Sequence, residues 1–344
     1  MNFSFRDKSP YIIAEIGVNH EGSVKNAMKL IEQAKIGGAQ AAKFQSYKAD
    51  TIASVNSPAY WSSEVNPIRS QHELFKIYDS FNEEDYVRLA EFCYKIDIDF
   101  ASTPFDDHSI DFLEPIVPFY KIASADITNH PFIEKIAKKN KPTIISTGAS
   151  KVEEIQDAVK IIRKFNDNEL CVMHCILSYP TKNADANLNM IEDLNQKFEN
   201  LIIGYSDHTK PDEEMLILST AYIKGAIVLE KHFTLDKTLP GNDHFHAMDT
   251  DDLKKFNKNI KTINTVLGNK TKTPISSELI ARKNARRSIV VSKKIEKGNF
   301  FNEKFLTYKR PGTGISPKYW TEIIGKKAKR DLEQDHILMW DDIE

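Results

Sequence analysis

The organisation of the chain is clearest at Gly204-Tyr205-Ser206-Asp207-His208 and, a little further on, at Leu229-Glu230-Lys231-His232-Phe233. Each stretch is the polar end of a short apolar run, and each ends close to a histidine. Side chains two apart on a β-strand share a face, so each histidine points the same way as the Ser206 or Glu230 before it. On neighbouring strands the two imidazoles would lie within reach of one metal ion, although hydrogen-bonding histidines fit the pattern equally well.

Eight apolar runs alternate with amphipathic stretches over the first 267 residues. We expect strands at 11–17, 41–47, 99–105, 119–124, 142–148, 170–176, 201–208 and 226–233, with helices at 24–36, 83–96, 131–139, 151–165, 213–224 and 251–267. Strict alternation predicts a parallel sheet with crossover helices. Because no glycine-rich dinucleotide fingerprint follows the first strand, the pattern favours a closed TIM (β/α)8 barrel over an open doubly wound sheet. Catalytic groups of such barrels gather at the C-terminal strand ends.

Residues 1–267 should therefore form a catalytic barrel domain. The long connection 48–82 carries Tyr60 and Trp61, and we read it as an irregular loop at the mouth of the barrel. A polar, proline-containing linker is expected at 268–284. A small β-rich domain should follow at 285–344, near the lower size limit for folding alone.

Composition limits the possible functions. The chain has 344 residues, of which 41% are hydrophobic and 28% are charged. Its formal net charge of -2 lacks the excess of positive charge that is typical of nucleic-acid-binding proteins. The three cysteines show no disulfide or metal-knuckle spacing, which favours reduced thiols in the cytoplasm. The N-terminus has no signal-like apolar segment, and no run approaches the roughly 18 apolar residues of a membrane span. We expect a cytoplasmic protein with neither nucleic-acid nor membrane partners.

The other strand ends carry complementary polar groups: Glu15, Lys43, Gln45, Thr103, Lys121, Ser124 and Ser146. A lysine within a strand is costly unless it meets an anion, although each lysine taken singly also fits a solvated or salt-bridged surface position. Together with the histidines, the set indicates metal-assisted chemistry on a small phosphorylated anion. In the loop after the last strand we read His244 and His246 as solvent-exposed, and Asp243 as the better candidate for a substrate contact.

Seven motifs in order resemble the bacterial sialic acid (nonulosonic acid) synthase family. They are Ile13-Ala14-Glu15-Ile16-Gly17-Val18-Asn19-His20-Glu21-Gly22-Ser23, Lys43-Phe44-Gln45-Ser46, Ser102-Thr103-Pro104-Phe105, Tyr120-Lys121-Ile122-Ala123-Ser124, Ser146-Thr147-Gly148 and the two histidine-bearing stretches. In the tail, Lys309-Arg310-Pro311-Gly312-Thr313-Gly314 resembles the family's antifreeze-like (SAF) domain. The resemblance implies a transferase that condenses phosphoenolpyruvate with an N-acetylmannosamine-type or 2,4-diacetamido hexose. The product would be a nine-carbon 2-keto-3-deoxy sugar acid (sialic, legionaminic or pseudaminic acid), and phosphate would be released.

The resemblance also implies roles for individual residues. His208 and His232 would hold a divalent metal, most commonly Mn²⁺, with Co²⁺ or Mg²⁺ as alternatives, and Glu15 and Glu230 would join them as catalytic groups. Phosphoenolpyruvate would contact Lys43, Thr103, Lys121, Ser124, Ser146 and Ser206. The sugar would contact Gln45, Tyr179, Asp243, Glu15 and Arg310. Because the family arginine reaches the sugar from the partner's SAF domain, a domain-swapped homodimer is implied.

One position departs from the family pattern. Leu177 stands where neuraminate synthases place an asparagine, and leucine cannot make that hydrogen bond. Together with the Tyr60 and Trp61 loop, this favours a 2,4-diacetamido hexose, the precursor of legionaminic acid. Two other functions stay open from the sequence: a 2-keto-3-deoxy aldonic acid phosphate synthase acting on a phosphorylated aldose, and a non-catalytic carbohydrate-binding protein.

Overall fold

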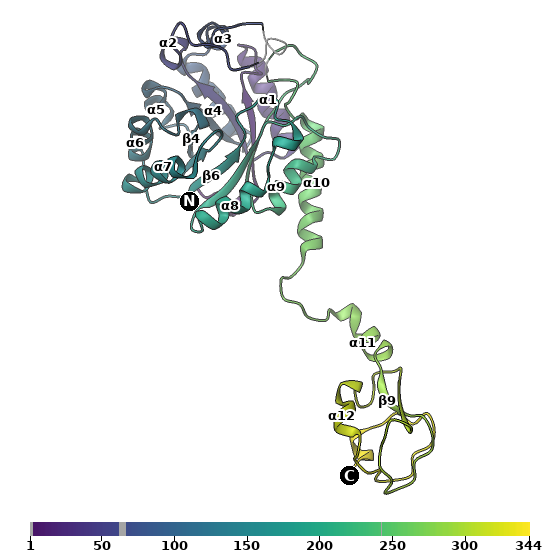
Figure 1. The fold of residues 1–344 in the computed structure, drawn as a ribbon. Coiled ribbons are helices and arrows are strands. Elements are labelled where there is room, and N and C mark those ends of the chain that lie inside the picture. The colour runs from purple at the N-terminus through teal and green to yellow at the C-terminus, as the bar shows by residue number, and fades with distance from the viewer. Residues whose placement is uncertain (1–2, 62–66, 242) are drawn as a thin grey trace. The chain divides into compact units, whose positions relative to one another are not determined.

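The computed structural model describes residues 3–61, 67–241 and 243–344. The chain divides into two compact units, Met1–Val266 and Leu267–Glu344 (Figure 1). No helix within the described residues is long and apolar enough to cross a membrane.

The first unit is built on one eight-stranded parallel sheet. Its strands are β1 (Tyr11–Gly17), β2 (Ala41–Ser46), β3 (Asp99–Pro104), β4 (Tyr120–Ile122), β5 (Thr143–Ser146), β6 (Leu170–Cys175), β7 (Ile202–Asp207) and β8 (Val228–His232). They hydrogen-bond in the order β3-β2-β1-β8-β7-β6-β5-β4, so β1 pairs with β8 and the sheet curls into a nearly closed barrel. This confirms the predicted TIM-barrel class, and each predicted strand matches an observed one.

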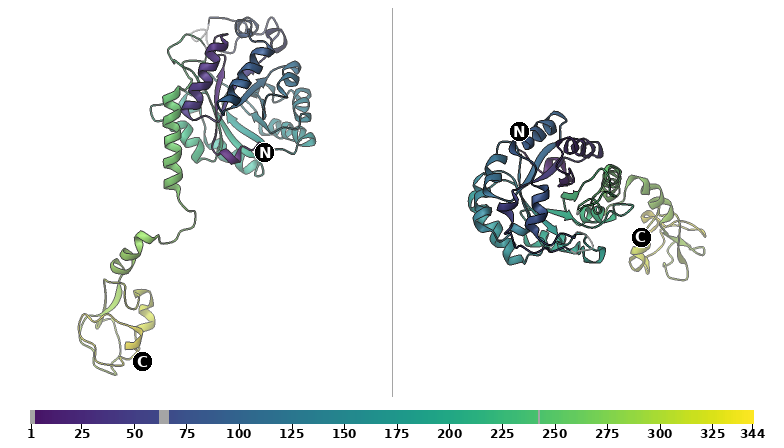
Figure 2. Two further views of the ribbon diagram at one scale, coloured as in Figure 1. Left: turned by 180° about the vertical axis from the view of Figure 1, so that it is seen from behind. Right: turned by 90° about the horizontal axis from the view of Figure 1, so that it is seen from above.

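Helices surround the strands (Figure 2). They are α1 (Val24–Gly37), α4 (Glu83–Lys95), α5 (Asp107–Leu113), α6 (His130–Lys138), α7 (Val152–Phe165), α8 (Asn189–Lys197), α9 (Leu216–Ile223) and α10 (Thr250–Leu267). Local sequence sets several of their ends. The Ser23 side chain accepts a hydrogen bond from the Asn26 amide at the start of α1, and Gly38 ends that helix in the left-handed conformation at φ 96°.

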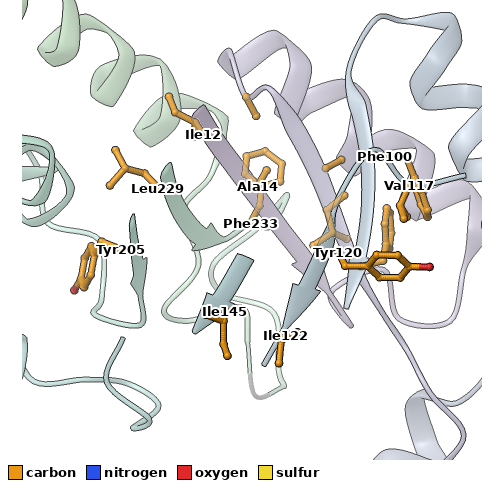
Figure 3. Close-up of a cluster of buried hydrophobic side chains, with 14 of the residues drawn as sticks. Ile12, Ala14, Phe100, Val117, Tyr120, Ile122, Ile145, Tyr205, Leu229 and Phe233 are labelled. Carbon is orange, nitrogen blue, oxygen red and sulfur yellow. The ribbon is translucent and has the colours of Figure 1, made fainter. Parts of the chain in front are cut away.

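Strand alternation separates two apolar layers. Ile12, Ala14, Tyr205 and Leu229 point outward and pack under the helices (Figure 3). Tyr11 and Ile13 point inward, and with Phe5 and Phe119 they belong to a second cluster that fills the interior. Rings of Phe3, Phe5, Tyr11 and Phe119 pack with centroids 4.9–5.9 Å apart at the N-terminal strand ends. The inward-facing series continues at Glu15, and the interior therefore changes from apolar to polar toward the C-terminal strand ends.

Gly204 shows how tightly this interior is filled. A Cβ atom at Gly204 would lie 2.7 Å from the Val228 carbonyl oxygen and 2.9 Å from Met173 Cγ, closer than real contacts allow. Glycine at this position, two residues before Ser206, therefore lets β7 approach β6 and β8 closely.

The connection 48–82 differs from the irregular loop that we expected. It contains helices α2 (Ala49–Ile52) and α3 (Gln71–Tyr78), while residues 62–66 lie outside the described part of the chain. The two helices are tied locally because Asp79 accepts hydrogen bonds from Lys48 Nζ at 2.6 Å and from the Ala49 amide at 2.9 Å.

The second unit is small and β-containing. It has α11 (Leu279–Ala285), which lies mostly within the range that we read as a linker, then antiparallel strands β9 (Ser288–Val291) and β10 (Leu306–Lys309), and α12 (Trp320–Ile323). Its own apolar cluster includes Ile289, Phe301 and Leu338. The fully buried Asp342 carboxylate accepts hydrogen bonds from Arg330 Nε, His336 Nε2 and the Met339 amide, each at 2.8 Å.

Candidate active site

A cavity of about 680 Å³ opens at the C-terminal ends of the barrel strands. Because inward positions alternate, the residues that line it come from successive strand ends. They include every predicted site residue of the first unit: Glu15, Lys43, Gln45, Thr103, Lys121, Ser124, Ser146, Tyr179, Ser206, His208, Glu230, His232 and Asp243. As predicted, the 48–82 connection contributes to the mouth, through Thr51, Tyr60 and Trp61 among others. Arg310 belongs to the second unit and follows β10, so its role at the sugar stays a prediction.

Glu230 lies between the two buried lysines. Its Oε1 accepts a hydrogen bond from Ser206 Oγ at 2.9 Å and lies 3.5 Å from Lys121 Nζ, while its Oε2 lies 3.6 Å from Lys43 Nζ. Burial by itself raises the pKa of Glu230, but the two ammonium groups lower it overall to about 2. Glu230 is therefore a carboxylate at neutral pH, and the two lysines together carry one positive charge more than it neutralises.

Each lysine has a second contact that fixes its ammonium group. Lys43 Nζ lies 2.5 Å from Glu15 Oε2 and donates to Thr103 Oγ1 at 3.0 Å. Lys121 Nζ donates to Ser146 Oγ at 2.7 Å. Charged lysines that are less than 5% exposed, with hydroxyls beside them, form a setting that can receive a phosphate or carboxylate.

Glu15 links this lysine region to the histidines. Its Oε1 accepts a hydrogen bond from Gln45 Nε2 at 3.0 Å, and in the sheet Glu15 pairs with Lys43 of β2 and His232 of β8. Burial raises the pKa of Glu15, and the nearby Lys43 only partly offsets this. A carboxyl group with a raised pKa holds a proton more readily than an ordinary carboxyl group does.

The predicted metal pair lies at the tips of β7 and β8, with ring centroids 5.6 Å apart. His208 Nδ1 lies 2.8 Å from the Ile176 carbonyl oxygen, so Nδ1 carries a proton and Nε2 is the nitrogen that can bind a metal when the ring is neutral. His232 Nδ1 is buried and has no hydrogen-bond partner within the described residues. Burial, followed by the charges of His246 and His208, lowers the pKa of His232 far below its usual value, so the ring is neutral. These donors fit a divalent ion.

The loop after β8 corrects one expectation. We expected His244 and His246 to be exposed, but they are only 3% and 0% exposed because the loop folds back over the strand ends. His244 Nδ1 lies 2.7 Å from Thr234 Oγ1. Asp243 Oδ2 lies 3.5 Å from His232 Nδ1, and burial, followed by the charge of Glu15, raises the pKa of Asp243 to about 7.

The β6 side of the cavity mixes polar and apolar groups. The Tyr179 ring packs against His208 with centroids 4.2 Å apart, and Ser124 Oγ accepts a hydrogen bond from the Gly148 amide at 2.9 Å. Leu177 lines the same cavity. So does Cys175, which we had not singled out, although its place two residues after Met173 on the inward face of β6 could have indicated it.

Behind the histidines lies an ion pair that we did not predict. Lys231 Nζ contacts Asp207 Oδ2 at 2.7 Å, and both residues are only 1% exposed. Asp207 Oδ1 also accepts hydrogen bonds from Tyr205 Oη at 3.0 Å, the Thr209 amide at 2.9 Å and Thr209 Oγ1 at 2.8 Å. Asp207 and Lys231 are partners in the β7–β8 ladder and directly precede the two histidines, so the pair fixes the register of the histidine-bearing tips.

Comparison with known proteins gives two family matches. The NeuB family model matches residues 30–272, and the SAF domain model matches residues 286–344.

Several relatives match along nearly the whole chain. An uncharacterized protein of Methanocaldococcus jannaschii is 41% identical, covering 97% of this chain and 94% of its own length. N,N'-diacetyllegionaminic acid synthase of Legionella pneumophila is 38% identical with the same coverage, 97% and 94%. Among solved structures, an N-acetylneuraminic acid (sialic acid) synthetase of Leptospira borgpetersenii is 34% identical, with a TM-score of 0.70 over 79% of this chain and 89% of that one.

Proposed function

The chain belongs to the NeuB family, and we propose that it is a nonulosonic acid synthase that condenses phosphoenolpyruvate with an acetamido-hexose. The observation that carries this proposal is that one cavity is lined by the buried Lys43 and Lys121, by the carboxylates beside them, and by His208 and His232. Such a cavity offers an anion site and a carbonyl site side by side.

The lysines receive the phosphoenolpyruvate. Lys43 and Lys121 supply charge to its phosphate and carboxylate, with hydroxyls contributed by Thr103, Ser124, Ser146 and Ser206. Holding both anionic groups fixes carbon 3 of phosphoenolpyruvate toward the histidines, and this orientation lowers the entropic part of the barrier.

The open-chain aldehyde of the sugar lies at the histidine side, held by Gln45, Tyr179 and Asp243. His208 and His232 would hold a divalent ion, which we propose to be Mn²⁺, with Co²⁺ or Mg²⁺ as alternatives, and which polarises the aldehyde oxygen when bound. Carbon 3 of phosphoenolpyruvate then forms the new carbon–carbon bond. Water adds at carbon 2, and phosphate leaves as the carbon–oxygen bond breaks, so one water is consumed for each phosphate released.

The carboxyl groups handle protons and charge. Glu15, whose pKa is raised by burial, is placed to take a proton from the attacking water or return it to the new hydroxyl. Glu230 stays ionised and holds both ammonium groups in place, since its pKa is about 2. Its charge also offsets part of the positive field that would otherwise hold phosphate too tightly.

For the sugar, we propose a 2,4-diacetamido hexose that leads to a legionaminic-type acid. Leu177 and the aromatic rings of Tyr60 and Trp61 line the cavity, and they suit the methyl group of a second acetamido substituent better than a bare hydroxyl. The Legionella relative, named for N,N'-diacetyllegionaminic acid, supports this choice.

A product-mass assay tests the proposal. The protein is incubated with phosphoenolpyruvate and either N-acetylmannosamine or a 2,4-diacetamido hexose, with and without chelator, while released phosphate is measured. We expect a nine-carbon acid and equimolar phosphate, with the diacetamido sugar preferred and the chelated sample inactive. Absence of product with every sugar in the presence of Mn²⁺, Co²⁺ or Mg²⁺ would refute the proposed reaction.

We also propose that the active form is a domain-swapped homodimer in which Arg310 of the partner subunit reaches the sugar. Mixing an inactive His208→Ala chain with an inactive Arg310→Ala chain tests this directly. In random heterodimers one site in two is intact, so activity should recover to about a quarter of wild type. No recovery after dissociation and remixing would show that each chain supplies its own arginine.

A further inference from the structure

The loop after β8 brings a third imidazole to the histidine pair. His246 is completely buried, and its ring centroid lies 4.8 Å from that of His232 and 5.8 Å from that of Tyr179. One donor atom from each of His232, Asp243 and His246 can be chosen so that all three lie within 4.8 Å of one another. A set of two imidazoles and one carboxylate at this spacing can close on a single ion with small side-chain movements.

We propose that His246 is a ligand of the divalent cation, which this chain holds with His232, Asp243 and His246 in addition to His208. The inference deepens the proposed function and rests on its assignment of a metal to His208 and His232. Asp243 has two carboxylate oxygens, so one can bind the ion while the other contacts the sugar.

The surroundings of the three donors favour coordination over simple packing. His232 Nδ1 is buried without a hydrogen-bond partner within the described residues, and it lies 3.5 Å from Asp243 Oδ2, a distance that an ion between them would explain. His244, two residues before His246, is fixed instead by Thr234. The same loop thus turns one imidazole toward a hydroxyl and the other toward the histidine pair.

A third imidazole changes which metal the site prefers. Imidazole nitrogen suits Co²⁺ and Zn²⁺, whereas oxygen-rich sites suit Mg²⁺ and Mn²⁺. With His208, His232 and His246 the site offers three nitrogens and one carboxylate, which leaves positions for substrate oxygen or water on a five- or six-coordinate ion. We therefore expect the protein to bind Co²⁺ and Zn²⁺ more tightly than Mn²⁺, by a wider margin than two histidines alone would give.

Metal titration of the full-length chain tests this proposal. Chelator-treated wild type and His246→Gln are titrated calorimetrically with Co²⁺, Zn²⁺ and Mn²⁺ in turn, without substrates. We expect His246→Gln to lose at least about tenfold in affinity for Co²⁺ and Zn²⁺, and less for Mn²⁺, since even outer partners of metal ligands are worth about 10–100-fold. His244→Gln is the matched control from the same loop and should bind like wild type. Equal affinities in wild type and His246→Gln would overturn the proposal.

A measurement on the wild-type protein alone guards against misfolding of the variant. Pulsed electron paramagnetic resonance of the Mn²⁺-loaded protein, labelled with ¹⁵N-histidine, counts the coordinated imidazoles. Three support the proposal, and two overturn it. Neither the metal titration nor the resonance measurement depends on turnover. A three-imidazole site in a protein that makes no sugar acid would refute only the proposed function. A two-imidazole site in an active synthase would refute only the role of His246.

Discussion

Replacing Lys231 with methionine is expected to destabilise the barrel and weaken metal binding together. Lys231 and Asp207 form an ion pair in which both partners are about 1% exposed, so removing the ammonium group leaves a buried carboxylate without its positive partner. Breaking such a pair from one side typically costs about 3–5 kcal/mol. Because the three hydrogen bonds to Asp207 Oδ1 remain, we expect the lower end, about 3 kcal/mol.

Chemical denaturation followed by circular dichroism measures this cost. In the wild type, burial by itself raises the pKa of Asp207, but Lys231 and the hydrogen bonds lower it overall. The stabilisation by the ion pair is therefore present above the pKa of about 3.9 that the carboxyl group has in the unfolded chain, and it is lost as pH falls through the lower pKa of the folded state. The deficit of Lys231→Met should therefore be large at pH 7, and the wild-type advantage that it reflects should be lost only below about pH 3.9, as the pH falls through the folded pKa of Asp207.

A matched variant separates the charge from the packing. Lys231→Met combined with Asp207→Asn removes the uncompensated charge and should recover most of the lost stability. Metal affinity should fall in the single variant and partly return in the double one, because the pair directly precedes the two histidines. The reasoning fails if the single variant costs less than about 1 kcal/mol, the value of an exposed pair, or if the double variant is no more stable than the single one.

Three further outcomes are expected. Lys121→Ala should lower kcat/KM for phosphoenolpyruvate by about ten- to a hundredfold in steady-state kinetics, since a hydrogen bond to a charged group is worth roughly 1.5–3 kcal/mol. The control Lys160→Ala changes an exposed lysine and should leave kcat/KM unchanged. A kcat/KM of Lys121→Ala equal to that of wild type would show that Lys121 does not belong to the anion site. Leu177→Asn should raise the kcat/KM ratio of N-acetylmannosamine to the diacetamido sugar by about tenfold, and an unchanged ratio would show that this wall does not select the sugar. Burial by itself raises the pKa of Asp342, but its hydrogen-bond donors lower it overall, so the second unit should lose stability as pH falls below about 3.9. In thermal unfolding, Asp342→Asn should show the loss already at pH 7; a variant as stable as wild type would contradict this.

The barrel could be predicted because the sequence pattern of each strand and helix is contained within a short segment of the chain. Short apolar runs separated by amphipathic stretches define the strands, and period-two alternation identifies Lys43, Glu230 and the histidines as inward-facing. The polar side chains that alternation places at the strand ends do line one cavity. Their chemical roles remain predictions.

The rest depended on contacts between distant segments. Burial of His246 results from the path of a loop whose conformation no periodicity dictates. The Asp207–Lys231 pair was missed because charged residues at outward-facing positions look like surface groups, and the sequence does not show that these two positions are buried. Helices α2, α3, α5, α8, α11 and α12 were not predicted, because each is too brief to show a clear amphipathic pattern.

The aromatic cluster of Phe3, Phe5, Tyr11 and Phe119 has a consequence for molecular traffic. These rings pack the interior at the N-terminal strand ends and close that end of the barrel within the described residues. Under the proposed function, the reactants and products would therefore exchange at the C-terminal strand ends, where Tyr60, Trp61 and Leu177 line the cavity. Slow release of a product from the cavity would then delay binding of the next reactants, because entry and exit would use the same end of the barrel.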